Sequence, residues 1–332
     1  MGNSHLPGAA GQQSQPGVIG LLLRRNIVKQ YDVVGLGLAT LDILAQTPRL
    51  PNSNDCFPIA ALEMQGGGPV ATALVALARL GASCNYLGSL AADDTARQII
   101  AELQRYGIDA GYCPQRDCGV SSASVILVEQ SNGQRAILFQ KSTSLDLQPE
   151  EVPEEVIKSA RALHLDGFFT LAAIHAAQFA RKNGVLVSFD GGAGELMWDE
   201  LTELLPLVDI LVVAKKFALD TSGVQDILAA GTQLLKTYQN QQVVITDGEH
   251  GSWYWDRHTH FHQPAFPVDV VDTTGAGDTF HGAYLFAVLQ PDWTPQYRLK
   301  FASAVAALKC KQLGGRKGIP TLAETLVFLN SH

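Results

Sequence analysis

The sequence has few of the residues that build disulfide frameworks and structural metal sites. Its 332 residues include five cysteines, an odd number spread between Cys56 and Cys310, and no two of them have Cys-x-x-Cys spacing. The nine histidines form no ligand motif beside them. In a chain of this length, such cysteines are typical of reduced thiols in a cytosolic protein.

Long apolar runs and basic runs are also absent. No stretch approaches ~18 uninterrupted apolar residues, so the sequence predicts no membrane span. Lys and Arg number 24 against 32 Asp and Glu, a formal net charge of −8 that argues against a nucleic-acid surface. The 46% hydrophobic content is ordinary for a globular protein, and the length suits one large domain or two smaller ones.

The N-terminal residues carry no recognisable sorting signal. Residues 1–17 are rich in Gly, Gln, Ser and Pro, and we expect residues 1–30 to form a disordered or irregular extension without chemistry. The apolar run 18–23 precedes Arg24 and Arg25, which is the wrong order for a secretory signal. Leu6 stands where a myristoylation signal has Ser or Thr. A cytoplasmic location is therefore expected.

Short apolar strands alternate with helix-length segments along the rest of the chain. Candidate strands are Tyr31–Gly37, Asn85–Leu90, Ala162–Leu165, Val185–Phe189, Asp209–Val213 and Gln242–Thr246. Candidate helices are Val70–Leu80, Asp93–Tyr106, Gly223–Tyr238 and a last helix, Leu299–Lys311. This rhythm predicts βαβ units and an α/β fold with a doubly wound, mostly parallel sheet flanked by helices. The aromatics Trp253–Trp255 and Phe261 predict a terminal hairpin.

Two further stretches predict a small accessory sheet. The chain from about 43 to 64 is extended and partly apolar, and the stretch from about 120 to 141 alternates around Asn132-Gly133, a hairpin signal. Between the first stretch and the helix from Val70 lies Gly66-Gly67-Gly68-Pro69. Such a glycine triplet fits close approach by a substrate and fits a flexible joint equally well.

Residues 272–282, Asp-Thr-Thr-Gly-Ala-Gly-Asp-Thr-Phe-His-Gly, carry the most informative local pattern. Apolar residues follow at helical spacing, so we expect Thr274 as the N-cap and residues 275–277 as the first turn. The unpaired N–H groups and the helix dipole there favour an anion, and Asp278 beside them is placed to deprotonate an acceptor hydroxyl. Taken alone, the pattern fits better a glycine-rich turn whose acid complements the helix dipole.

A dinucleotide site is disfavoured. The Gly35-x-Gly37 pair after the first strand has Thr40 at the third glycine position, and the prolines Pro48 and Pro51 interrupt the helix that must follow. A nicotinamide-dependent oxidoreductase is accordingly an unfavoured alternative. Asp42 lies just past the end of this strand, where ligand-facing groups of α/β sheets collect.

Several motifs in order resemble those of the PfkB/ribokinase family of carbohydrate kinases. Residues 272–282 resemble the C-terminal signature of that family, and Gly67-Gly68 with Arg79-Leu80-Gly81-Ala82 resembles its N-terminal signature. Thr246-x-Gly248-x-x-Gly251 resembles its nucleotide-side turn. Within the family the chain looks most like sulfofructose kinases, on residues 66–69, 262–266, 306–310 and 314–316 and on His281.

The resemblance implies transfer of the ATP γ-phosphate to a hydroxymethyl group of a ketose-like sugar, with Mg²⁺ and a stimulating K⁺. It implies a doubly wound α/β domain, residues 31–332, with a β-sheet lid that pairs two subunits into a homodimer. No nucleic acid or membrane partner is expected. Other acceptors of the family stay open, namely fructose, sulfofructose, a ketodeoxy sugar acid or a nucleoside, as does a non-catalytic sugar sensor.

The resemblance also assigns roles by position. It implies Asp278 as general base and an anion hole formed by Gly275, Ala276 and Gly277. The implied acceptor-binding residues are Thr40, Asp42, Gly67, Gly68, Thr72 and Asp166. The implied ATP-binding residues are Thr246, Gly248, Gly251 and Ser303, and the monovalent cation is expected near Asp272, Thr274 and Gly315.

The chain departs from the family pattern at three places. Thr72 replaces the asparagine of the N-terminal signature, so one hydrogen-bond donor remains there. Residues 214–217, Ala-Lys-Lys-Phe, replace Asn-x-x-Glu, so the acid that usually organises Mg²⁺ is missing. An anionic acceptor needs Arg or Lys, yet the stretch 44–64 holds only Arg49; Arg135 and Lys141 on the hairpin are the other candidates.

Overall fold

The computed structural model describes residues 1–2, 29–131, 133–192 and 201–332. Most of the predicted N-terminal extension, residues 3–28, lies outside this part of the chain, as does Asn132 of the predicted hairpin turn. The regular elements run from Tyr31 to Asn330.

A central eight-stranded sheet organises the molecule, in the order β14-β13-β12-β11-β10-β9-β1-β4. Six strands pair in parallel: β1 (Tyr31–Leu36), β4 (Cys84–Leu87), β9 (Ala160–Leu165), β10 (Leu186–Gly191), β11 (Ile210–Ala214) and β12 (Gln242–Thr246). The antiparallel hairpin of β13 (Ser252–Trp255) and β14 (His260–Gln263) closes one edge. The predicted mostly parallel sheet and terminal hairpin are confirmed.

Helices cover both faces of this sheet, because its buried strands carry apolar side chains on both sides. On one face, Val33 and Val244 pack with α1 (Pro69–Arg79), α2 (Asp94–Arg105), α7 (Ala276–Val288), α8 (Pro295–Lys309) and α9 (Leu322–Asn330). On the other, Val34 and Val243 pack with α3 (Glu154–Lys158), α4 (Thr170–Lys182), α5 (Lys215–Ser222) and α6 (Ile227–Tyr238). Successive residues of one strand thus pack into two separate hydrophobic cores, one on each face of the sheet.

Two helices are present where they were predicted, as α6 and α8, but one detail of each prediction was wrong. A helix from Gly223 was expected, but Gly223 has φ +71° and ends α5, while Asp226 caps the start of α6 through the amide of Ala229. The segment Leu299–Lys311 was expected to be the last helix, yet α9 follows it. The capping box of Thr321 and Glu324 marks the start of α9, and this pattern was overlooked in the sequence.

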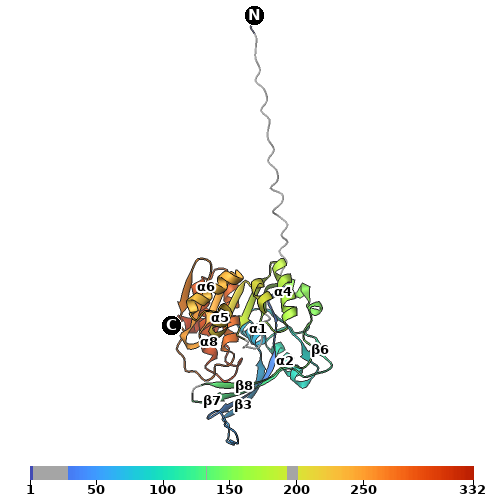
Figure 1. The fold of residues 1–332 in the computed structure, drawn as a ribbon, viewed down its shortest axis with the longest axis vertical. Coiled ribbons are helices and arrows are strands. Elements are labelled where there is room, and N and C mark those ends of the chain that lie inside the picture. The colour runs from blue at the N-terminus through green and yellow to red at the C-terminus, as the bar shows by residue number, and fades with distance from the viewer. Residues whose placement is uncertain (3–28, 132, 193–200) are drawn as a thin grey trace.

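A second sheet of four strands forms the accessory unit, in the order β3-β2-β7-β8 (Figure 1). Its strands are β2 (Thr40–Thr47), β3 (Ala61–Gly67), β7 (Ala123–Glu129) and β8 (Arg135–Gln140). A small parallel pair joins β5 (Leu90–Ala91) to β6 (Gln115–Arg116). In Figure 1 the four-stranded sheet lies at one end of the α/β body, below α1, α2 and α8. We call it the lid.

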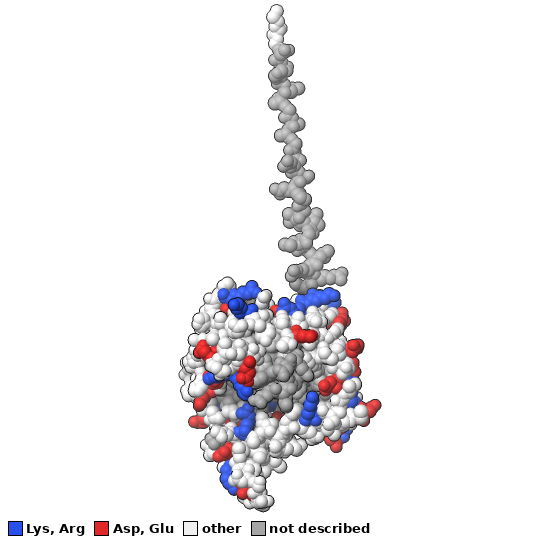
Figure 2. Space-filling view, viewed as in Figure 1, with Lys and Arg blue, Asp and Glu red and all other residues white. Residues whose placement is uncertain are grey.

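The surface and the thiols agree with the composition. All five cysteines lie in described residues, and none is paired. On the face drawn in Figure 2, acidic and basic side chains are interspersed. Within the described ranges, no helix is both long and apolar enough to cross a bilayer.

Candidate active site

The lid and the central sheet meet at one turn, residues 66–68, which brings the predicted acceptor-binding residues together. We call it the acceptor turn. The register places Thr40 opposite Gly67 and Asp42 opposite Gln65. Thr40 Oγ1 donates to Asp42 Oδ1 at 2.8 Å, and a Cβ on Gly67 would lie 2.0 Å from Asp42 Oδ2. Only glycine therefore allows the backbone to lie against this carboxylate. Burial raises the pKa of Asp42, while its hydrogen bond from Thr40 and the charge of Arg316 oppose that rise.

Gly68 turns the chain into α1. It is the N-cap of that helix at φ +91°, and a Cβ there would lie 2.5 Å from the carbonyl oxygen of Leu38. Pro69 follows at the first helical position, where its missing N–H costs nothing. The glycine triplet is thus a fixed turn built by close backbone contacts. The alternative of a flexible joint does not describe it.

Asp166 binds the main chain around this turn. Its carboxylate accepts hydrogen bonds from the amides of Leu38 at 2.8 Å, Phe168 at 3.0 Å and Val70 at 3.3 Å. The residue is buried, and this burial raises its pKa to about 7. Because the carboxylate is occupied by main-chain amides, its direct contribution is to fix where the acceptor turn begins.

Arg316, which the sequence analysis did not assign, lies beneath the same turn. Its side chain is 1% exposed, Nη2 donates to the carbonyl oxygen of Gly67 at 2.7 Å, and Nε donates to Thr72 Oγ1 at 3.2 Å. Nη1 lies 3.5 Å from Glu102 Oε1, and Glu102 in turn accepts the amide hydrogen of Gly66. The guanidinium thereby joins the C-terminal segment, the acceptor turn and α2.

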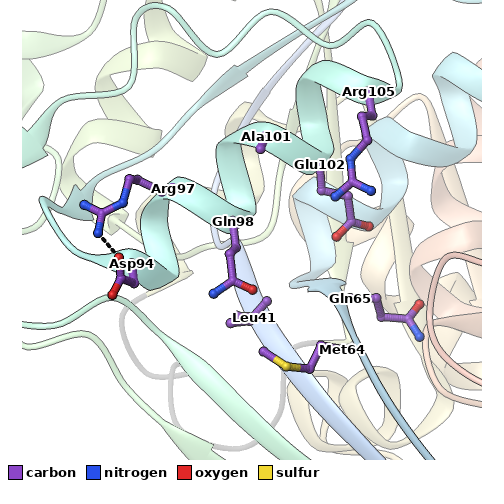
Figure 3. A pocket seen from close by; sticks show the side chains of 9 residues that line it. All are labelled: Leu41, Met64, Gln65, Asp94, Arg97, Gln98, Ala101, Glu102 and Arg105. Atoms are coloured by element: carbon purple, nitrogen blue, oxygen red, sulfur yellow. Dashed lines mark ion pairs between the residues drawn. The ribbon is translucent and has the colours of Figure 1, made fainter.

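Glu102 reaches this network from a helix that also borders a separate cavity. That cavity, of about 370 Å³, lies between α2 and the lid strands β2 and β3. Figure 3 shows Glu102 and Arg105 on α2 facing Gln65, with Arg97 paired to Asp94 at the other end of the helix. The cavity is lined by both charge signs, and its Glu102 is already engaged with Arg316.

The signature 272–282 forms the start of α7, with one difference from the prediction. The N-cap is Gly275 at φ +70°, not Thr274, and no side chain caps the helix. Thr274 instead directs both its amide and its Oγ1 to Asp272 Oδ1, at 2.8 and 2.7 Å. A Cβ on Gly275 would lie 2.8 Å from Gly315 Cα, whereas a Cβ on Gly277 would meet nothing within 4 Å. The turn therefore packs tightly against Gly315 on the side of Gly275, which we call its back, and has free space at Gly277, which we call its front.

Asp278, in the first turn of α7, lies among buried ionisable groups. Burial raises its pKa to about 7, the neighbouring carboxylate of Asp190 adds to the rise, and Arg135 and Lys309 oppose it. Asp190, at the end of β10, has its own pKa raised by burial, and its Oδ1 lies 3.1 Å from His281 Nε2. Burial lowers the pKa of His281 to about 3, which favours the neutral imidazole.

The predicted nucleotide residues gather around one cavity of about 500 Å³. Thr246, Gly248 and Gly251 line it from the β12–β13 turn, Ser303 lines it from α8, and Ala276 and Gly277 line it from α7. Its remaining walls are mostly apolar: Ala265, Phe266, Pro267, Val268, Val270, Phe280, Ala306, Ala307 and Cys310. Ser303, Ala306, Ala307 and Cys310 share one helix face at i, i+3, i+4 and i+7, a pattern that could have revealed this wall.

A lid residue also reaches this region. Arg135 Nη1 on β8 donates to Thr273 Oγ1 at 2.6 Å, directly before the anion-hole turn. Residues 214–217 begin α5, where Lys215 Nζ lies 2.9 Å from Asp247 Oδ2. Lys215 thus lies two residues before Phe217, the position at which the resemblance implies an acid.

The geometry has its counterpart in known proteins. Residues 31–322 match the family described as pfkB family carbohydrate kinase. Fructokinase-1 from Zea mays is 29% identical over 291 residues, 81% of this chain and 90% of the relative. The structure of Arabidopsis thaliana ribokinase complexed with ribose and ATP has a TM-score of 0.76 at 24% identity, covering 90% of this chain and 98% of that one. An E. coli protein assigned as ribokinase II, in complex with ATP and Mg²⁺, has a TM-score of 0.79 at 22% identity, covering 91% and 100%.

The family match covers well over half of the chain and includes both sheets and the α7 signature. The predicted fold, a mostly parallel ribokinase-like sheet with a lid, is confirmed by these structural neighbours. The chain belongs to the pfkB family of carbohydrate kinases, which makes it a phosphotransferase that acts on a sugar hydroxyl.

Proposed function

We propose that the protein transfers the γ-phosphate of ATP to a hydroxymethyl group of a neutral, ketose-like sugar. One observation carries this proposal. Ala276 and Gly277 line the nucleotide cavity, and Asp278 follows them directly in the same helical turn. A phosphate chain bound at the open front of that turn would therefore end beside a carboxylate.

Asp278 acts as the general base in this account. It removes the proton of the acceptor hydroxyl as the oxygen attacks the γ-phosphorus, the bond to the β-phosphate oxygen breaks, and ADP leaves. The amides of Gly275, Ala276 and Gly277 hold the charge on the transferring group. A raised pKa suits the base, because a carboxyl titrating near neutral pH accepts the proton more readily than an ordinary one.

The nucleotide cavity fits ATP by its chemistry. Apolar residues of α8 and of segment 265–270 would contact the adenine, and the glycines of the β12–β13 turn leave room for the phosphates. Arg135 lies at the lid side of the anion-hole turn, where a guanidinium would meet charge that develops on the phosphoryl group.

Mg²⁺ fits a site shared between the nucleotide and Asp190. Among the described residues no group of three or more His, Cys, Asp or Glu forms a metal cage. However, Asp190 Oδ2 is buried without a hydrogen-bond partner, and Mg²⁺ in kinases is held by one or two carboxylates, phosphates and water. The ion would neutralise charge on the phosphate oxygens of ATP.

A neutral acceptor is favoured over an anionic one. Arg316 lies at the acceptor turn, but its guanidinium already binds Gly67, Thr72 and Glu102. Arg49 pairs with Asp55 at 2.5 Å on the lid surface. Asp42 adds a carboxylate that suits hydroxyl donors. These observations, with the fructokinases among the relatives, favour fructose over sulfofructose or a ketodeoxy sugar acid.

A homodimer through the lid accompanies this proposal. Register places Ile43, Met64, Val125 and Leu138 side by side on the lid face opposite Asp42, and Met64 and Leu138 are 56% and 63% exposed. An exposed apolar sheet face of this kind is typical of a protein interface. A cytoplasmic location, where ATP is abundant, is part of the same proposal.

An ATP-consumption screen tests the assignment across ketoses, sulfosugars, sugar acids and nucleosides. We expect turnover with fructose or a related neutral ketose, and no turnover by the Asp278→Asn variant. Turnover only with sulfofructose or a sugar acid would contradict the neutral-acceptor argument. Sugar binding without any ATP consumption would instead support the sensor alternative.

A further inference from the structure

Lys309, the last residue of α8, is buried completely. Its side chain is 0% exposed and is among the largest fully buried side chains of the described residues. Lysine is rarely buried in this way, because removing an ammonium from water is costly unless other groups compensate for the loss. The residue is not used in the mechanism above, so its burial calls for a separate physical reason.

The ammonium of Lys309 meets the loop that precedes the anion hole. Nζ donates to the main-chain oxygen of Asp272 at 3.0 Å, across 37 residues of chain. Asp272 is itself 0% exposed. Burial lowers the pKa of Lys309, and the negative charge of Asp272 opposes that fall by favouring the ammonium. Lys309 also acts electrostatically on Asp278, so its charge is felt at the base.

The oxygens of Asp272 are all engaged by donors. Oδ1 accepts the amide and hydroxyl hydrogens of Thr274, Oδ2 accepts the amide hydrogen of Gly314 at 2.7 Å, and the main-chain oxygen accepts from Lys309. Gly315 packs against Gly275 in the same place. The residues Asp272, Thr274 and Gly315, near which a monovalent cation was expected, are therefore together, but an ammonium already lies among them.

A second cation does not fit this arrangement. At Asp272 it would compete with N–H, O–H and ammonium donors for the same oxygens, and it would be repelled by the charge on Lys309. The expected K⁺ site is thus not supported by the residues that would have to form it.

We propose that Lys309 takes the place of a monovalent cation, as a covalently attached positive charge that holds the Asp272–Gly275 loop in position behind the anion hole. Since residues 273, 276 and 277 line the nucleotide cavity, the lysine would order the loop that receives the phosphates. The protein would then bind nucleotide and keep its fold without K⁺. The nucleotide arm of this inference rests on the proposed kinase function, and the stability arm does not.

The first experiment uses the unmodified protein. Thermal unfolding and calorimetric titration with MgATP are compared in potassium chloride and in tetramethylammonium chloride at equal ionic strength. We expect the same Tm and the same Kd in both salts. A rise in Tm, or a severalfold tighter Kd, specific to K⁺ would overturn the proposal, whether or not any sugar is phosphorylated.

Two substitutions separate the charge from the space it fills. Lys309→Met removes the charge and keeps the bulk, so we expect weaker MgATP binding by about tenfold or more in either salt, the factor that a charged hydrogen bond supplies. Lys309→Ala opens room beside the Asp272 oxygens, so K⁺ but not tetramethylammonium should raise its Tm. Lys311→Met, at an exposed lysine two residues away, is the matched control and should behave like the unmodified protein.

Three results contradict the proposal. These are unchanged MgATP binding by Lys309→Met, equal Tm values of Lys309→Ala in the two salts, and an equal effect of Lys311→Met. If MgATP binds to none of these proteins, the kinase proposal fails, while the Tm comparison still decides the role of Lys309.

Discussion

The guanidinium of Arg316 donates a 2.7 Å hydrogen bond to the carbonyl oxygen of Gly67, a residue 249 positions earlier in the chain. The same side chain donates to Thr72 Oγ1 and lies 3.5 Å from Glu102, so one buried charge joins the C-terminal segment and α2 to the acceptor turn and the start of α1. A buried arginine of this kind depends on its partners, because removing one member of a buried ion pair leaves the charge of the other uncompensated.

Substitution of Arg316 by Met is expected to destabilise the protein and to impair acceptor binding. The substitution leaves the Glu102 carboxylate and the Gly67 carbonyl oxygen without their partner. Breaking a buried ion pair in this way lowers the unfolding free energy by about 3–5 kcal/mol. The KM for the sugar should rise more than the KM for ATP, since the turn belongs to the acceptor side.

Two controls accompany that variant. Arg105→Met removes an exposed arginine from the same helix as Glu102 and should change neither quantity. The double variant Arg316→Met with Glu102→Gln should recover part of the lost stability, because the stranded charge is gone. Equal effects of Arg316→Met on both Michaelis constants would contradict a role specific to the acceptor turn.

Gly277→Val should weaken nucleotide binding without destabilising the fold. A Cβ at Gly277 meets nothing within 4 Å, so the added side chain fits the free protein but occupies the space that a phosphate needs. We expect the Kd for MgATP to rise by roughly tenfold or more, while Tm changes little. The Kd of the Gly277→Ala variant should lie between those of the unmodified protein and the valine variant. Unaltered ATP affinity in the valine variant would remove the anion hole from the account.

Arg135→Met should lower kcat more than it changes the KM for the sugar. The guanidinium contacts Thr273 beside the anion hole, and its charge reaches Asp278. A donor that meets developing charge on a phosphoryl group contributes mainly in the transition state. Lys141→Met on the same lid hairpin is the control, since Lys141 is exposed and has no described contact with the site. Equal losses from both variants would indicate a general effect of lid charge.

The pH dependence follows from the raised pKa of Asp278, about 7 instead of about 3.9 in the unfolded chain. The base acts in its ionised form, so kcat/KM should rise with pH and level off above about 7, with Asp278 and Asp190 titrating as a pair. A kcat/KM that is flat between pH 5 and 8, measured with saturating MgATP, would contradict this assignment.

Stability should show the opposite trend. Between about pH 4 and 7 the unfolded chain has lost the Asp278 proton and the folded chain keeps it, so this group makes the unfolding free energy fall as pH rises. Asp278→Asn removes that dependence. Its Tm should therefore exceed that of the unmodified apoprotein by an amount that grows from pH 5 to pH 7.

The sequence allowed much of this structure to be anticipated where the signal is local. The strands of the parallel sheet follow from short apolar runs, and the α7 turn follows from residues 272–282. The cap of that helix could not be predicted, because the Thr274 hydroxyl donates to Asp272 Oδ1 instead of accepting a hydrogen bond from a helix amide. Gly223 was read as a helix start although its positive φ ends the preceding helix.

Long-range contacts could not be anticipated in this way. Nothing near Arg316 in the chain indicates that it lies under Gly67, and nothing near Lys309 points to Asp272. Both positions depend on how α8 and the C-terminal segment pack against the lid and α7. The nucleotide residues were found because each lies in a recognisable turn or helix face, whereas these two buried charges carry no local pattern.

The most direct measurement is turnover and ligand binding by Asp278→Asn at pH 8, alongside the unmodified protein. We expect kcat to fall by about two to four orders of magnitude, while calorimetry gives nearly unchanged Kd values for MgATP and for the sugar. Full turnover by this variant would contradict the central claim that Asp278 is the general base.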